Sequence, residues 1–100
     1  PPDNSDFITR IYQAQCVKDE TMAEAIAAQL TNNTLVVHFT GAFHSDYKLG
    51  TADRVKRRRP QANVKVISAI PAENLDAPKT QENLKRGDYL LFTLQPGEKK

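Results

Sequence analysis

The chain has 100 residues, of which 39% are hydrophobic and 26% are charged, and its formal net charge at pH 7 is +2. This length and composition are enough for one small globular domain and no more. The net charge by itself gives no support to a nucleic-acid or membrane partner. Four of the 14 Lys and Arg residues form one run, Lys56-Arg57-Arg58-Arg59, and are not spread over a face. The lone Cys16 excludes an internal disulfide, and no apolar run has the length of a membrane span.

The first predicted element is a helix that either Asn4 or Ser5 can cap. Apolar residues recur at helical spacing in its first turns: Phe7, Ile8, Ile11 and Tyr12. Further along the same face, Gln15 and Asp19 interrupt the apolar stripe, which resumes at Met22. This interruption has two interpretations with different consequences for function.

The pattern favours a helix break within residues 17–20, followed by a second helix that starts with a capping box at residues 21–24. The alternative is one face that looks into a polar pocket. In such a pocket an amide and a carboxylate are useful, whereas buried and unpaired they would be costly.

The next predicted elements form a parallel unit. Residues 35–40, Leu-Val-Val-His-Phe-Thr, are apolar almost throughout and predict a strand buried on both faces. A short helix is expected from Thr51 until Pro60 stops it, and residues 64–70 predict a second strand. A strand, a helix and a strand in this order form a right-handed parallel unit, whose ligands gather at the carboxyl ends of the strands. His44 follows the first of these strands and therefore lies where a ligand is expected.

The remaining elements complete the predicted fold class. Residues 71–87 predict a long connection, 89–94 a third strand and 95–100 a frayed tail. The chain is thus predicted to be α/β, with a partial, mostly parallel three-stranded sheet and the order helix, second helix, strand, helix, strand, strand. About three helical stretches cannot cover both faces of such a sheet, so something else must cover it.

Three groups of residues carry a resemblance to a known family. They are Gln13-Ala14-Gln15, Asp19-Glu20-Thr21-Met22-Ala23 and the loop Gly41-Ala42-Phe43-His44-Ser45-Asp46-Tyr47-Lys48-Leu49-Gly50, with residues 66–71 and 87–93 extending the match. Together they resemble the ChaN-like haem-binding family of the Tiki superfamily. The pairing of Asp-x-x-Met-Ala with Gly-x-x-His is more specific than either motif alone. Family members usually carry an earlier half with a Gly-Glu-x-His type of motif, which has no counterpart here, so residues 1–100 are expected to be the C-terminal half of a ChaN-like domain.

The resemblance implies haem binding by a bacterial protein of iron uptake. Such a protein would be exported, and periplasmic or anchored to the membrane as a lipoprotein through a missing N-terminal region. The superfamily also contains metal-dependent hydrolases, which give the alternative function, and a third possibility is an interaction module with a decayed site. The residues favour a binding protein over an enzyme, because a hydrolytic metal needs at least three protein ligands and too few are convincing here.

His44 and Tyr47 are the first candidate haem ligands, because imidazole and phenolate both bind haem iron and these residues share one short loop. The alternatives are a hydrogen-bonding role for His44 and a sheet-edge position for Tyr47. A divalent metal would instead use His44 with Asp19, and only Glu20 and His38 could add a further ligand.

Four other residues are expected near the haem. Gln15 would belong to the polar pocket. Gly41, like Gly50 at the other end of the loop, would permit positive φ or close approach of the backbone. Met22 could offer an axial thioether, although a core position is favoured. Arg54, beside the N-terminal amides of the helix at Thr51, is best placed to receive a propionate.

Two structural expectations follow. The side chains of His44, Tyr47, Asp19 and Gln15 should converge on one cleft. The exposed faces of the strand at 35–39 should be covered by a second copy of the chain or by a separate N-terminal half of the same domain.

Overall fold

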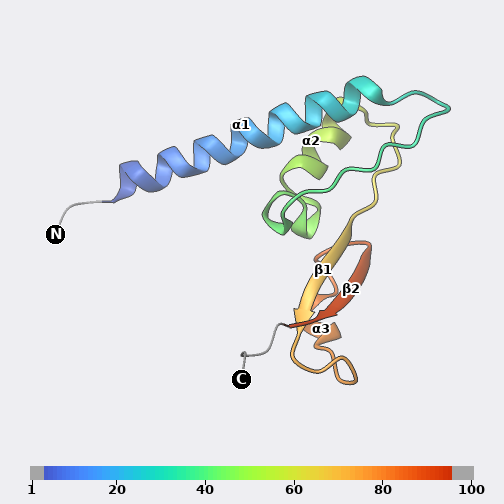
Figure 1. Cartoon of the computed structure of the whole chain (residues 1–100). Helices are drawn as coiled ribbons and strands as arrows, with labels where there is room; N and C mark the ends of the chain where they lie inside the picture. Colours follow the sequence, from blue (N-terminus) through green and yellow to red (C-terminus); the bar gives the residue numbers. More distant parts are fainter. Residues whose placement is uncertain (1–3, 96–100) are drawn as a thin grey trace.

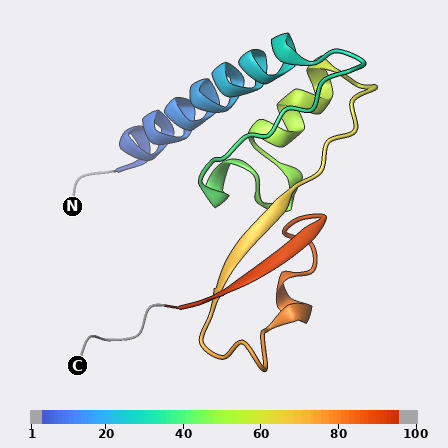
Figure 2. The same ribbon diagram turned by 45° about the vertical axis from the view of Figure 1, so that its right-hand side comes forward.

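The computed structural model describes residues 4–95 (Figure 1). The elements in chain order are helix α1 (Ser5–Gln29), the short 3-10 helices η1 (Ala42–His44) and η2 (Asp46–Lys48), helix α2 (Thr51–Arg58), strand β1 (Ile67–Ala72), the one-turn helix α3 (Thr80–Asn83) and strand β2 (Tyr89–Leu94). In both views α1 and α2 lie side by side, and the strand pair lies apart from them (Figures 1 and 2). The loop that contains η1 and η2 lies at the junction of these two parts.

The α/β class is confirmed, with a parallel sheet. Strands β1 and β2 pair in parallel, with Ile67 opposite Tyr89 and Ala72 opposite Leu94. A parallel pair needs a long crossover connection, which residues 73–88 supply with α3 inside it. The predicted strand at 89–94 coincides with β2, whereas β1 begins at residue 67 instead of 64.

The predicted strand at 35–40 is wrong for the part of the chain that the structure describes. The segment is extended, but the sheet of residues 4–95 has two strands, and the backbone of residues 35–39 makes no hydrogen bond there. Leu35 and Phe39 are 89% and 90% exposed. The β-propensity of this segment reflects side chains that suit a half-buried sheet surface, and without a neighbouring strand to bond it the ladder does not form.

The favoured helix break within 17–20 is also wrong. Helix α1 is continuous over 25 residues, and the Thr21 hydroxyl donates a hydrogen bond to the Val17 carbonyl, 2.8 Å away, instead of capping a new helix. The physical reason lies at Asp19, which is buried but has hydrogen-bond partners from other elements. The second interpretation, a helix face that looks into a polar site, describes this part of α1.

Packing is confined to two small groups of buried residues. Ala23, Ala27 and Val55 are buried where α1 meets α2, and Ile70 and Ala72 are buried on one face of β1. The Cα radius of gyration is 16.7 Å, whereas a compact domain of this length has about 13 Å. Many large apolar side chains consequently remain exposed within residues 4–95.

The strand ladder extends one residue beyond β2. Gln95 donates its backbone N–H to the Ala72 carbonyl, 2.8 Å away, which extends the ladder past β2. The rest of the predicted frayed tail, residues 96–100, lies outside the described residues. Over residues 4–95, no helix combines the length and the apolar character needed to cross a membrane.

Candidate functional site

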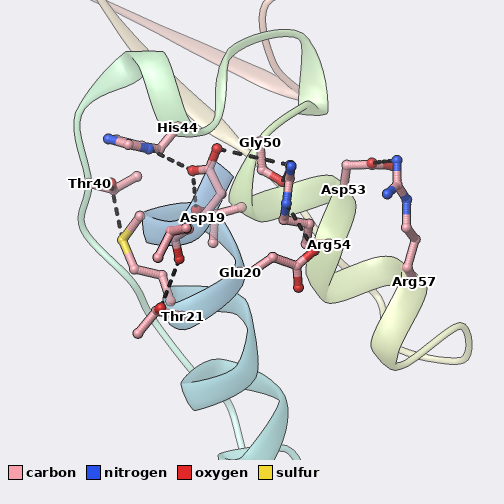
Figure 3. A network of polar contacts seen from close by, with 12 residues as sticks. Asp19, Glu20, Thr21, Thr40, His44, Gly50, Asp53, Arg54 and Arg57 are labelled. Atoms are coloured by element: carbon pink, nitrogen blue, oxygen red, sulfur yellow. Dashed lines mark hydrogen bonds and ion pairs between the residues drawn. The ribbon is translucent and has the colours of Figure 1, made fainter. Parts of the chain in front are cut away.

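Asp19 is the centre of a network that joins three elements (Figure 3). Its Oδ1 lies 2.6 Å from Nδ1 of His44, in the η1 turn, and accepts a hydrogen bond of 2.9 Å from the Thr51 hydroxyl at the start of α2. Its Oδ2 lies 4.0 Å from Nη1 of Arg54, one turn further along α2. Asp19 is 6% exposed. A carboxylate buried to this degree needs charged and hydrogen-bonding partners of this kind.

A glycine allows the loop to turn tightly enough to bring His44 to Asp19. Gly50 precedes α2 and has a φ of 61°, in the left-handed region that favours glycine. A Cβ at this position would lie 2.7 Å from the backbone oxygen of His44. Gly50 therefore shows both the positive φ and the close approach that the sequence pattern predicts for the two glycines of this loop.

The orientation of His44 determines what its imidazole can do. Nδ1 faces a carboxylate, so the neutral ring carries its hydrogen there and keeps its lone pair on Nε2. Figure 3 shows the second ring nitrogen directed away from Asp19. Histidines that bind metals usually have this arrangement, in which a carboxylate fixes the tautomer and raises the basicity of the other nitrogen.

An outer layer of charge surrounds the network on the α2 side. Nε of Arg54 lies 3.1 Å from Oε1 of Glu20, and Nη2 of Arg58 donates to Oε2 of the same carboxylate at 2.9 Å. The hydrogen bond from Arg58 is the main reason that the pKa of Glu20 is lowered below its usual range. Arg54 also donates to the Gly50 carbonyl at 3.1 Å. An anionic ligand at Arg54 would therefore compete with Glu20.

Of the residues expected to converge, His44 and Asp19 meet, and Gln15 lies one turn before Asp19 on the same face of α1. Oε1 of Gln15 is buried and has no hydrogen-bond partner among residues 4–95. Tyr47 lies outside this network. Its backbone N–H donates to the Arg86 carbonyl at 2.7 Å, and its hydroxyl makes no hydrogen bond within the described residues.

The two remaining candidates, Met22 and Gly41, lie in ordinary surroundings. Sδ of Met22 accepts a hydrogen bond of 3.9 Å from the Thr40 hydroxyl. Gly41 has an ordinary φ of −65°, and a Cβ on it would be 4.0 Å from the nearest atom. Gly41 thus needs neither the positive φ nor the close approach that was expected of it.

The geometry does not favour the metal-site alternative. Within residues 4–95, no three His, Cys, Asp or Glu side chains come together in a way that could hold a metal ion. Glu20 is engaged by two arginines, and His38 lies in the exposed segment 35–40. His44 and Asp19 are therefore left without a third ligand in this part of the chain.

The contacts that sequence reasoning missed come from Thr51, Asp46 and Arg86. Thr51 carried a usable signal, because a hydroxyl residue directly after Gly50 is typical of a helix start. Both oxygens of the Asp46 carboxylate are engaged, by Ser68 Oγ at 3.1 Å and by Arg86 Nε at 2.9 Å. These partners are far away in the sequence, and no local pattern indicates them.

Comparison with known families shows where the chain belongs. The model of the family described as "Haem-binding uptake, Tiki superfamily, ChaN" matches residues 2–55, more than half of the chain. The chain is a member of this family. The ChaN match contains Asp19, His44 and Arg54 and ends within α2, before β1. No curated protein and no solved structure matches the chain.

Proposed function

We propose that this ChaN-family chain binds haem, with His44 as an axial ligand through Nε2. The observation that carries the proposal is the 2.6 Å contact between Nδ1 of His44 and Asp19, which leaves Nε2 as the free donor atom. The matched family is described as one of haem-binding uptake. Bound haem would supply an iron centre for which imidazole is a common axial ligand.

The surroundings of His44 fit a flat and largely apolar ligand. Phe43, Tyr47 and Leu49 lie on the same loop and are 92%, 53% and 60% exposed. Covering such a group of apolar side chains is favourable, and exposed apolar patches commonly mark binding sites. The unpartnered Oε1 of Gln15 also supports a polar ligand group beside α1, because a buried acceptor without a donor is costly.

The other expected ligands take secondary places in this proposal. The exposed Tyr47 is the candidate for a phenolate ligand from the same loop. Arg54 and the first amides of α2 are the candidates to receive a propionate, at the expense of the Glu20 contact. Met22 is the least favoured ligand, because its sulfur accepts a hydrogen bond from Thr40.

We also propose that residues 1–100 act as the C-terminal half of a ChaN-like domain. The bare face of the segment 35–40 and the exposed apolar residues of α1, among them Phe7 and Ile8, support a missing cover. The cover would be a second copy of the chain or a separate N-terminal half. From the uptake function of the family we infer a role in bacterial iron acquisition, in an exported protein that is periplasmic or lipid-anchored.

A haem titration tests the ligand assignment. We expect a Soret shift with the wild-type chain, and an affinity lower by about tenfold or more for His44→Ala. Asp19→Asn should lower the affinity to a smaller degree, because the imidazole loses its carboxylate partner. His38→Ala is the matched control in the exposed segment. Unchanged Soret spectra and affinity in His44→Ala would refute the assignment.

A further inference from the structure

The loop that carries His44 is held from two sides, and one side belongs to the part of the chain beyond the family match. On the first side, Asp19 of α1 contacts the His44 ring. On the second side, the turn before β2 contacts η2, which follows η1 after a single residue. The two short helices are linked through Ser45, whose N–H donates to Ala42 and whose carbonyl accepts from Lys48.

The second support is a closed ring of polar contacts around Asp46. Its Oδ2 lies 2.9 Å from Nε of Arg86, and its Oδ1 accepts a hydrogen bond of 3.1 Å from the Ser68 hydroxyl. The Arg86 carbonyl accepts from the Tyr47 backbone N–H at 2.7 Å. It also lies 3.0 Å from the Ser68 hydroxyl, whose single hydrogen is shared between this carbonyl and Asp46 Oδ1. Asp46 is thereby fixed through both of its oxygens.

A neighbouring pair reinforces this ring. Oδ1 of Asp88 accepts from the Lys48 ammonium at 3.1 Å, and its Oδ2 accepts from the Val66 backbone N–H at 2.7 Å. The bond from Val66 is the main reason that the pKa of Asp88 is lowered below its usual range. Gly87 lies between Arg86 and Asp88 in the sequence. It passes so close to β1 that a Cβ on it would lie 2.7 Å from Ser68 Oγ.

These contacts maintain a backbone shape that the loop would not adopt alone. Tyr47 and Lys48 have φ values of 61° and 59°, in the left-handed region. Such conformations are unfavourable for residues with large side chains and persist only where the surroundings impose them. The surroundings here are the contacts from Arg86 and Asp88. Loss of these contacts would allow residues 46–48 to relax, and His44 lies only two residues earlier.

We propose that Asp46 and Arg86 are positioning residues that fix the orientation of the His44 imidazole for its ligand. The segment that lies outside the family match thereby contributes to the site within it. The inference deepens the proposed haem function and rests on it for the ligand. The orientation of His44 can nevertheless be measured without haem.

The test uses the ligand-free chain first. Long-range proton–nitrogen NMR reports which ring nitrogen of His44 carries the hydrogen. We expect the neutral wild-type ring to carry its hydrogen at Nδ1. Asp46→Asn and Arg86→Ala should each lower the ratio of the Nδ1-protonated to the Nε2-protonated tautomer by about fivefold, the factor that one ordinary hydrogen bond contributes to an equilibrium. Arg86→Lys should restore part of the ratio. Arg57→Ala is the control, because it removes an ion pair with Asp53 within α2.

A haem titration of the same variants forms the second arm. We expect the affinity to fall by about fivefold in Asp46→Asn, the same factor as the tautomer ratio and no more than in Asp19→Asn, because Asp46 acts on His44 only through the loop. Thermal melts identify any variant that fails to fold, and Arg86→Lys then replaces Arg86→Ala. Variants that melt earlier but keep the wild-type tautomer ratio and haem affinity would overturn the proposal. A changed ratio in a chain that binds no haem would uphold the positioning role and refute the haem function.

Discussion

The carboxylate of Asp19 has more partners than its place in a helix requires. It contacts His44 and Thr51 directly, and Arg54 lies within ion-pair distance. A buried carboxylate with such partners orients the side chains around it. If one of these side chains moved away, the carboxylate would lose a partner, at a cost in free energy. The same residue therefore gives His44 its tautomer and joins α1 to α2.

Variants of Arg54 and Arg58 distinguish a specific anion site at Arg54 from diffuse attraction to a basic surface. Arg54→Ala should weaken haem binding by about 1–3 kcal/mol, the range for a charge-assisted hydrogen bond. Arg58→Ala should change it little. The Arg54 side chain is 17% exposed and lies beside Asp19, whereas that of Arg58 is 37% exposed and lies beside Glu20.

Isothermal titration at low and high salt measures both variants. Equal losses that vanish together at high salt would indicate a diffuse basic surface instead of a site. No loss from either variant would contradict the placing of a propionate at Arg54.

At the scale of elements, the two glycines that bound the His44 loop have different tasks. Gly50→Ala should lower the free energy of unfolding by about 1–3 kcal/mol, the cost of a strained backbone position. The reasons are its φ of 61° and the 2.7 Å approach of a Cβ to the His44 oxygen. Gly41→Ala is the matched control, because its φ is ordinary and its Cβ would meet nothing closer than 4.0 Å. Urea denaturation measures both, and equal effects would contradict this distinction.

Elements with local signals were predictable from the sequence. Helix α2 begins after Gly50 and ends before Pro60, and the apolar run of β2 lies between two glycines. The pattern around Asp19 gave the wrong helix break, because a polar residue on an apolar stripe is tolerated once distant partners satisfy it. The extended segment 35–40 was misassigned for a related reason, since a strand depends on a neighbour that local sequence does not reveal.

The candidate site was predictable to the same degree. His44 and Asp19 do meet as expected. That expectation rested, however, on the less favoured interpretation of the α1 face and on a strand at 35–40 that does not form within residues 4–95. Asp46 and Arg86 were missed, because their contact depends on how the η2 loop meets the turn before β2. Periodicity and motif spacing carry no information on such a contact.

At the scale of the molecule, the described residues enclose little core. No large side chain within residues 4–95 is fully buried, and Phe7, Leu35 and Phe39 are among the exposed ones. Apolar area of this extent gains free energy when a second surface covers it. The molecule is therefore suited to association.

We accordingly predict that the chain associates with another copy or with a separate N-terminal half. Sedimentation velocity over a range of concentrations should show a larger species, because covering the segment 35–40 is favourable. Phe39→Ser should weaken this association, whereas Leu75→Ser in the connection between β1 and β2 should not. A cooperatively melting monomer at all concentrations, with no second polypeptide, would refute the prediction.

The contacts around η2 also join distant parts of the chain, so we expect them to form late. Lys48 and Asp88 are 40 residues apart, and a contact at this separation forms only after a long loop has closed, at an entropic cost. Helix α1 relies on neighbours along the chain and forms far sooner. During synthesis, the residues of the loop leave the ribosome well before Arg86 and Asp88 do. Under the positioning role proposed for Asp46 and Arg86, the imidazole of His44 gains its final orientation only after residues 86–88 have been made, and a chain that stops before them carries the site residues without the site.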